Sequence, residues 1–237
     1  MSKLGKLYMI PGTIGDGAPD QVIGKSNIEV LSSLRYLIVE SQKNAIRFLV
    51  KCGLKGILDQ IEFGILNEHT RQKELDFILE PVLKGQNAGI LSDAGCPGVA
   101  DPGADIVALA HRRGIEILPM VGPNSMILGL MGSGLNGQRF TFNGYLPAKN
   151  PDRIKTIKEI EARSRKFRET QIFIEAPYRN VQLMTDLVKV LSPRTMLCVA
   201  TDLTQQDQFL KTRQVSEWKS NFPNINKRPT VFLFLAF

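Results

Sequence analysis

Short apolar runs alternate with segments of helical periodicity through the first half of the chain. Of all the sequence features, this alternation most narrows the possible fold classes. The runs have the length of buried strands and are Leu7–Ile10, Tyr36–Val39, Ala88–Leu91 and Ile115–Leu118. Between them, His69–Lys84 carries apolar residues on one helical stripe, and Gly85 follows as a C-terminal cap. Asp105–Arg113, closed by Gly114, predicts a second helix. Strands that alternate with helices form parallel sheets, so the first half is predicted to be an α/β domain with a mainly parallel sheet and covering helices.

The second half of the chain has a different pattern. Arg139–Tyr145 alternates apolar and polar residues, and a long charged helix is expected after Pro151. Further strands are expected at Gln171–Ile174, Thr195–Ala200 and Thr230–Phe237, with a helix at Tyr178–Leu191. The pattern changes near Gly132–Gln138. The sequence therefore predicts two α/β domains, 1–134 and 135–237, the second built on a mixed sheet.

Charge is unevenly distributed between the two halves. Residues 1–138 hold 13 Lys and Arg against 14 Asp and Glu, whereas residues 139–237 hold 17 against 9. The excess begins in the segment 149–168, which has eight basic and three acidic residues. Such asymmetry fits a polyanion such as RNA, because Lys and Arg that neutralise phosphates release counterions. A solvated helix face explains the same charges, and charge alone leaves both interpretations open.

Composition excludes several classes of protein. The 237 residues are 43% hydrophobic, which is enough for a folded core. The longest apolar run, Thr230–Phe237, is far shorter than the roughly 20 residues of a membrane span, so no membrane partner is expected. The first residues lack the pattern of a signal peptide, and three widely spaced cysteines without a CxxC pair predict neither disulfides nor a metal site. A cytoplasmic location is expected.

The segment Ser92–Gly103 is the strongest candidate for a ligand-binding loop. It begins at the carboxyl end of a predicted buried strand, where open α/β sheets bind ligands. Its glycines and prolines make a rigid loop whose backbone can approach a ligand closely. Asp93 stands at the strand tip and suits a ribose hydroxyl or an amino group. Asp101 is also explained as the N-cap of the following helix.

A second loop of this kind is Val121–Ser125, which follows the next predicted strand. Ser125 can cap the apolar helix Met126–Met131, whose first N–H groups could hold a ligand. Two glycine-bearing loops at neighbouring strand ends would form the floor of a cleft.

Two segments of the sequence partly resemble nucleotide-binding motifs but do not match them. Gly24-Lys25-Ser26 resembles the end of a Walker A loop, yet Pro19 occupies the position of its first glycine. Gly12, Gly15 and Gly17 follow the first strand with the spacing GxxGxG, and Pro19 then interrupts the helix that a dinucleotide fold would start. Neither a nucleotide triphosphatase nor an ordinary Rossmann domain is favoured.

Six motifs together resemble one family. They are Thr13–Asp16, Asn67–His69, Ser92–Gly103, Gly122–Ser125, Gly144–Lys149 and Glu175–Arg179. In them the chain resembles the tetrapyrrole (corrin/porphyrin) methylase superfamily, and within it the branch that 2′-O-methylates a ribose of small-subunit ribosomal RNA. The chain departs from that branch at Glu40–Lys43, Tyr178, Thr201–Gln205 and Lys227–Pro229. The cofactor loops are kept, while the acceptor-side charges differ.

The resemblance implies two α/β domains with S-adenosyl-L-methionine in the cleft between them, a homodimer, and ribosomal RNA or the small ribosomal subunit as partner. The expected cofactor-binding residues are Gly12, Ser92, Asp93, Ala94, Gly95, Cys96, Pro97, Gly122, Ser125, Met126, Leu146, Ala176 and Thr230. The last three lie in the loops and strand that resemble the family's second-domain contacts.

Methyl transfer to a ribose requires no metal ion and no nucleophilic side chain. It requires alignment of donor and acceptor, and a base near the hydroxyl can help. Glu40, His69 and Asp101 are the candidates for that base. His69 is equally explained as a surface residue at the start of a helix.

Two other functions fit the same residues. One is a methyltransferase of this superfamily that acts on a tetrapyrrole-like or other small molecule, which the altered acceptor-side motifs allow. The other is an RNA-binding protein that keeps the fold without catalysis.

Overall fold

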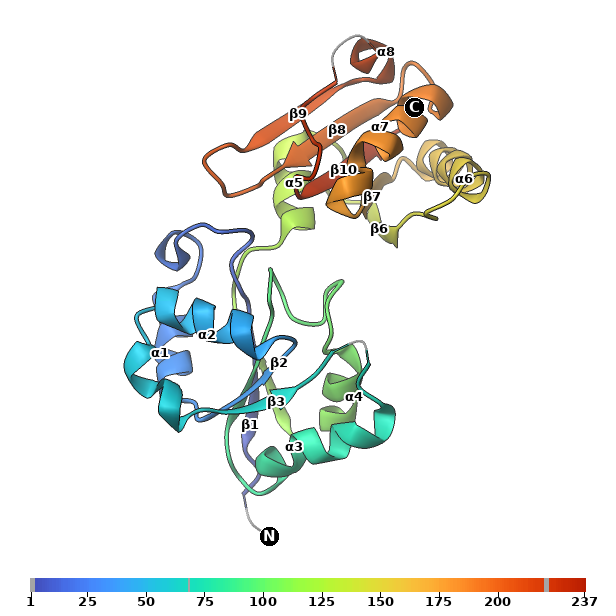
Figure 1. Ribbon diagram of the computed structural model, residues 1–237. Helices are drawn as coiled ribbons and strands as arrows, with labels where there is room; N and C mark the ends of the chain where they lie inside the picture. Colours follow the sequence, from blue (N-terminus) through green and yellow to red (C-terminus); the bar gives the residue numbers. More distant parts are fainter. Residues whose placement is uncertain (1–2, 68, 220–221) are drawn as a thin grey trace. The chain divides into compact units, whose positions relative to one another are not determined.

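The computed structural model describes residues 3–67, 69–219 and 222–237 (Figure 1). The chain divides into two compact units, Met1–Asn124 and Ser125–Phe237. The boundary expected from the sequence, after residue 134, lies beyond the helix α5 (Ser125–Ser133). That helix belongs to the second unit because Met126 and Leu130 pack in a core with Ile172 and Leu233.

The first unit is built on a five-stranded parallel sheet. Its strands are β1 (Lys6–Ile10), β2 (Tyr36–Val39), β3 (Glu62–Ile65), β4 (Ala88–Leu91) and β5 (Glu116–Pro119). Their order is β3-β2-β4-β1-β5, with Leu7 opposite Ala88 and Lys6 opposite Glu116. The expected parallel sheet is therefore confirmed. Because all the strands are parallel, the loops that follow them meet at one edge of the sheet.

Helices cover both faces of this sheet. They are α1 (Lys25–Ser33), α2 (Gln42–Lys51), α3 (Leu75–Leu83) and α4 (Ala104–Arg112), with short 3-10 segments at Pro19–Gln21, Lys55–Gln60 and Gln72–Glu74. Leu79 of α3 and Ile106 of α4 share one core cluster with Ile90 of β4. On the other face, Leu31 of α1 and Leu49 of α2 pack with the neighbouring residue of that strand, Leu91. Side chains of one buried strand thus alternate between the two cores.

The helix expected at His69–Lys84 begins later than the periodicity suggested. His69 lies in a turn in which Asn67 Oδ1 accepts a hydrogen bond from His69 N, at 2.9 Å. The Thr70 hydroxyl accepts another from Asn67 N, also at 2.9 Å. These side chains compete with helical hydrogen bonds, so the α-helix starts only at Leu75. It ends at Leu83, and Gly85 follows with a positive φ of 98°, as expected for a C-terminal glycine.

The second unit is built on a mixed sheet, as expected. Its strands are β6 (Phe140–Tyr145), β7 (Thr170–Ile174), β8 (Met196–Thr201), β9 (Phe209–Gln214) and β10 (Thr230–Leu235). Their order is β6-β7-β10-β8-β9, and only β6 and β7 pair in parallel. The other elements are α6 (Asp152–Phe167), the 3-10 turn Pro177–Arg179, α7 (Asn180–Val190) and α8 (Val215–Trp218).

The two faces of the second sheet are covered by different helices. α5 packs on one face, and Ile157 of α6 and Leu183 of α7 pack with Phe173 and Phe232 on the other. Among the described residues, no helix is long and apolar enough to cross a membrane.

Candidate functional site

The carboxyl edge of the first sheet brings the loops after β1 and β4 into direct main-chain contact. Ser92 N donates to Ile10 O at 3.2 Å, and Gly12 N donates to Gly95 O at 2.9 Å. A Cβ atom at position 12 would overlap the carbonyl oxygen of Ser92. Glycine is therefore required at this position for the two backbones to approach each other.

The loop after β5 joins the same edge. A Cβ atom at position 122 would overlap the ring of Pro11, so Gly122 packs directly against the loop after β1. Cys96 Sγ donates to Pro123 O at 3.4 Å, which ties the β4 loop to the β5 loop. The structure thus brings together the expected cofactor-binding residues of the first unit. They are Gly12, Ser92, Asp93, Ala94, Gly95, Cys96, Pro97 and Gly122.

Within the β4 loop, the Ser92 hydroxyl closes a tight turn with Ala94. It accepts a hydrogen bond from Ala94 N at 3.2 Å and donates to Ala94 O at 3.1 Å. Gly95 follows with a positive φ of 76°, a conformation that favours glycine. The loop is thereby held in one shape by its own side chain and backbone.

Asp93 is exposed at the tip of the β4 loop. Its Oδ2 accepts a hydrogen bond of 2.6 Å from Asn44 Nδ2, which α2 places there. Asn44 was not predicted as a site residue. Its signal in the sequence was Ser41, whose hydroxyl accepts from Asn44 N at 3.4 Å and caps α2. The Asn44 amide occupies one acceptor position of the Asp93 carboxyl, whose other oxygen could accept from a ligand hydroxyl or ammonium group.

Asp101 is partly buried and does not cap a helix. The N-cap of α4 is Gly103, and no side chain bonds to the first N–H groups there, so the N-cap interpretation of Asp101 is wrong. Burial raises the pKa of Asp101 to about 6, and the charges of Glu40 and Asp93 act in the same direction. A hydrogen bond from Ser92 opposes that rise. Asp101 is therefore a carboxyl whose protonation changes close to neutral pH.

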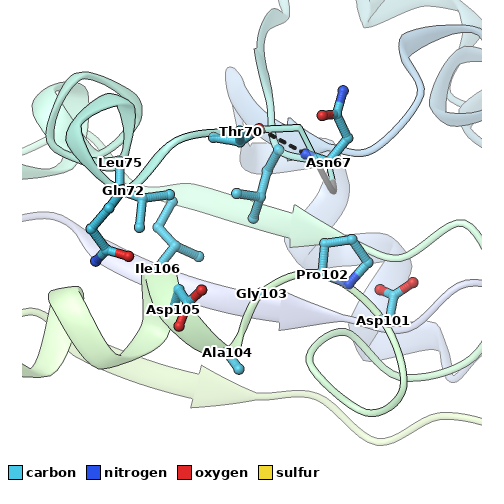
Figure 2. A pocket seen from close by; sticks show the side chains of 11 residues that line it. Asn67, Thr70, Gln72, Leu75, Asp101, Pro102, Gly103, Ala104, Asp105 and Ile106 are labelled. Carbon is cyan, nitrogen blue, oxygen red and sulfur yellow. Dashed lines mark hydrogen bonds between the residues drawn. The ribbon is translucent and has the colours of Figure 1, made fainter.

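A cavity of about 250 Å³ opens beside Asp101 (Figure 2). Its walls are the segment after β3 and the start of α4, and it is lined by Leu66, Asn67, Thr70, Gln72, Leu75 and Asp101–Ile106. A smaller gap of about 10 Å³ lies next to it and is lined in part by Glu40, Asp101 and Pro102. The sequence singled out Asn67 and Asp101 but did not indicate this cavity, because lining residues such as Leu66, Leu75 and Ala104 carry no chemical signal. His69 is exposed in the preceding turn, and Glu68 lies outside the described residues.

Three predicted residues of the second unit lie at one edge of its own sheet. Leu146 follows β6, Ala176 follows β7, and Thr230 begins β10. The register places Tyr145 and Val231 on either side of Ile174. Leu146, Ala176 and Thr230, which lie one or two positions from these residues in the chain, therefore share one edge of the sheet. The Thr230 hydroxyl bonds to that of Thr201 at 3.1 Å. Ser125 and Met126 are the first residues of α5.

At this second edge an arginine holds a buried carboxylate. Glu175 Oε1 accepts from Arg179 Nη2 at 2.6 Å, from Arg179 Nε at 2.9 Å and from Ala176 N at 2.7 Å. Its other oxygen, Oε2, is buried without a hydrogen-bond partner among the described residues. The Arg179 guanidinium lies over the ring of Tyr178, which is exposed, as is Tyr145.

The basic segment 149–168 is less available to a polyanion than its composition suggests. Arg153 is buried, and its guanidinium bonds to Asp186 Oδ2 at 2.6 and 2.8 Å. Arg163 bonds to Glu169 at 2.8 Å, and Arg165 to the carbonyl oxygen of Phe237 at 3.1 Å. Of the eight basic residues of this segment, Arg153 is therefore not available to solvent, and Arg163 and Arg165, although exposed, are bonded within the protein. The exposed lysines of the segment are Lys149, Lys155, Lys158 and Lys166.

Comparison with solved structures supports the fold. The methyltransferase CobJ superposes with a TM-score of 0.65 over 98% of this chain and 94% of its own, at 14% identity. The uroporphyrin-III-C-methyltransferase of Thermus thermophilus gives 0.56 over 98% and 92%, at 15% identity. At these identities the likeness concerns the fold alone, and it confirms the tetrapyrrole methylase fold expected from the sequence. No family model matches the chain.

Sequence comparison is more specific. A ribosomal RNA small subunit methyltransferase I from Escherichia coli O157:H7 is 31% identical over 232 residues, which cover 97% of this chain and 77% of that relative. The protein of the same name from Synechocystis sp. is 33% identical over 87% of this chain and 70% of its own. The one from Vibrio cholerae is 28% identical over 96% and 76%. With this identity sustained across almost its whole length, the chain belongs to the ribosomal RNA small subunit methyltransferase I family.

Proposed function

We propose that this protein is an S-adenosyl-L-methionine-dependent methyltransferase that 2′-O-methylates a ribose in small-subunit ribosomal RNA. The observation that carries the proposal is the similarity to proteins named for that RNA over 97% of the chain. The retained loops Ser92–Gly103 and Gly122–Ser125 support the methyl donor, and the net charge of the second unit supports the RNA.

The carboxyl edge of the first sheet fits such a cofactor. Backbone packing at Gly12 and Gly122 leaves no space for a side chain, so these loops offer main-chain groups to a ligand. Asp93, exposed and oriented by Asn44, would bind a hydroxyl or ammonium group. Ser92–Pro97 and Gly122 would hold the cofactor, which supplies a sulfonium methyl group when bound. Leu146, Ala176 and Thr230 are proposed as further cofactor contacts on the strength of the resemblance.

Features of the second unit support RNA as the acceptor. It holds 17 Lys and Arg against 9 Asp and Glu, whereas the first unit holds 13 against 14. Lys155, Lys158 and Lys166 are exposed along α6 and suit phosphate contacts, which position RNA without reading its sequence. Tyr145 and Tyr178, both exposed, could stack on unpaired bases. A homodimer and a cytoplasmic location are proposed as well, and sedimentation equilibrium tests the first.

Labelled methyl transfer tests the proposed function. The full chain is incubated with methyl-labelled S-adenosylmethionine, small ribosomal subunits that lack ribose methylation, and a metabolite extract. We expect label in ribosomal RNA, at a single ribose when mapped by mass spectrometry. Label only in the metabolite pool would overturn the RNA acceptor and favour a small-molecule methyltransferase. Binding of cofactor and RNA without any transfer would favour a non-catalytic RNA-binding protein.

A further inference from the structure

The cavity beside Asp101 has the size and lining of a site for a small polar ligand. Its volume is about 250 Å³, and its lining combines apolar or small residues with the polar side chains of Asn67, Thr70, Gln72, Asp101 and Asp105. Figure 2 shows Asp101 and Asn67 towards one end, and Gln72, Asp105 and Ile106 towards the other. A ribonucleoside, with an apolar base face and several hydroxyl groups, matches this lining.

Ser92 links the cavity to the loop proposed to hold the cofactor. Its side chain lowers the pKa of Asp101, which lines the cavity, and its hydroxyl bonds to both main-chain groups of Ala94 in the loop. One residue therefore contacts both the cavity wall and the proposed cofactor loop. An acceptor in the cavity and a methyl donor on the loop would meet near Asp101.

We propose that this cavity receives the acceptor nucleoside and that Asp101 is the catalytic residue that takes the proton of its ribose 2′-hydroxyl. This inference rests on the proposed function and names the acceptor site within it. The 2′-oxygen forms the new bond to the methyl carbon as its proton passes to an Asp101 carboxylate oxygen. The bond between that carbon and the sulfonium sulfur breaks, and its electron pair remains on sulfur.

The other carboxyls and the histidine fit this role less well. Glu40 is exposed at the end of β2, and it lines the small neighbouring gap but not the cavity. His69 is exposed in its turn and is absent from the cavity lining. Asp93 is bonded to Asn44 at the loop tip. Burial, with smaller contributions from Glu40 and Asp93, raises the pKa of Asp101 to about 6, so it remains largely ionised at pH 7 but accepts a proton more readily than an ordinary carboxylate.

Replacement of Asp101 by its isostere tests the assignment. In Asp101→Asn we expect kcat for methylation of small subunits to fall about 100-fold or more, with affinity for S-adenosylmethionine within about twofold of wild type. The wild-type rate should rise with pH through about 6, and this limb should be absent from the residual activity of the variant. Asp59→Asn, an exposed carboxyl in the 3-10 segment Lys55–Gln60, is the matched control and should keep wild-type kcat.

Filling the cavity tests the acceptor site separately. Ala104 lines it from the first turn of α4. Ala104→Phe should raise KM for the small subunit about tenfold or more and change kcat much less. A readout without cofactor uses carbon-13-labelled Asp101 in the free protein. Its carboxyl titration should shift when a short single-stranded RNA is added, and should not shift with the 2′-deoxy form of the same sequence.

The outcomes separate the two proposals. Absence of methyl transfer to ribosomal RNA by the wild-type protein would overturn both. Transfer by wild type together with near-normal kcat in Asp101→Asn would overturn the role of Asp101 alone. An unchanged KM in Ala104→Phe, or identical titrations with the RNA and its 2′-deoxy form, would overturn the cavity as the acceptor site.

Discussion

The two units differ in the charge of the side chains that surround their partly or fully buried carboxyl groups. In the first unit, Asp101 has a serine hydroxyl and the carboxylates of Glu40 and Asp93 around it. In the second unit, an arginine bonds to each of four acidic side chains, namely Glu169, Glu175, Asp186 and Asp202. Burial, reinforced by the Glu40 and Asp93 carboxylates and opposed by Ser92, raises the pKa of Asp101 to about 6, so this carboxyl can exchange a proton near neutral pH. The arginine pairs of the second unit fix loops and helices, and they use part of that unit's positive charge internally.

The largest expected effect concerns the buried ion pair between Arg153 of α6 and Asp186 of α7. Arg153→Ala would leave the Asp186 carboxylate buried without its cation, which typically costs about 3–5 kcal/mol of unfolding free energy. Lys158→Ala, on the exposed side of the same helix, should change that free energy by less than about 0.5 kcal/mol. Denaturant unfolding of both variants measures the difference. Equal, small effects would mean that the arginines of the second unit do not hold its structure.

The second prediction uses the opposite pKa shifts of Asp101 and Glu169. Arg163, and the hydrogen bonds of Thr141 and Gln171, lower the pKa of Glu169 to about 2, so its ionised form stabilises the fold above pH 4.5. That contribution is lost as pH falls towards 2. The pKa of Asp101 is raised to about 6, so its ionisation destabilises the fold as pH rises from 3.8 through 6.

At pH 7, Asp101→Asn should therefore raise the unfolding free energy, by up to about 3 kcal/mol. Glu169→Gln should lower it by about 1–2 kcal/mol, a smaller effect because the Arg163 side chain is 52% exposed. The Asp101→Asn difference should vanish below about pH 3, and the Glu169→Gln difference near pH 2. Unfolding curves across this pH range check both. Shifts of the same sign in the two variants at pH 7 would contradict the comparison.

The third prediction concerns backbone packing at the first sheet edge. Gly12→Ala introduces a Cβ atom that overlaps the Ser92 carbonyl, so the two loops must move apart. Such overpacking costs about 1–3 kcal/mol, and we expect affinity for S-adenosylmethionine to fall about tenfold or more. Gly56→Ala is the control, because nothing lies within 4 Å of a Cβ there. Titration calorimetry on the full chain gives both affinities. Unchanged binding in Gly12→Ala would place the cofactor elsewhere.

The smallest expected effect concerns the exposed lysines of α6. Reversal of Lys155, Lys158 and Lys166 to Glu should weaken RNA binding for all sequences and leave cofactor affinity unchanged. The slope of log K against log salt should become shallower by roughly 0.7–0.9 for each phosphate that the protein no longer neutralises. Lys25, Lys55 and Lys84 of the first unit, reversed together, give the same change of net charge as a control. If both triple variants weaken binding equally, the second unit has no special role in holding RNA.

The strands that the sequence predicted most accurately are the most buried ones. Tyr36–Val39 and Ala88–Leu91 match their predicted bounds because both faces are covered, which gives a continuous apolar run. The two strands that were not predicted, Glu62–Ile65 and Phe209–Gln214, lie at the edges of their sheets and carry polar residues. The helix Gln42–Lys51 was not predicted either, although Ser41 caps it.

Parts of the candidate site were also predictable from the sequence, and other parts were not. The loops were found from sequence because glycine and proline leave a recognisable pattern where backbones pack closely. The cavity was not, because residues such as Leu66 and Ala104 carry no chemical signal until the chain folds. Arg153 was counted as a surface charge, since nothing in the local sequence indicates that Asp186, on another helix, would meet it in the interior.

The ion pair between Arg153 and Asp186 also bears on how this chain can evolve. Loss of either partner leaves a buried charge, whereas replacing both with apolar residues of similar volume is often neutral. Single substitutions at either position would therefore be removed by selection, and the route to change passes through two coordinated steps. Positions 153 and 186 should accordingly covary among descendants of this gene, even though neither touches the chemistry.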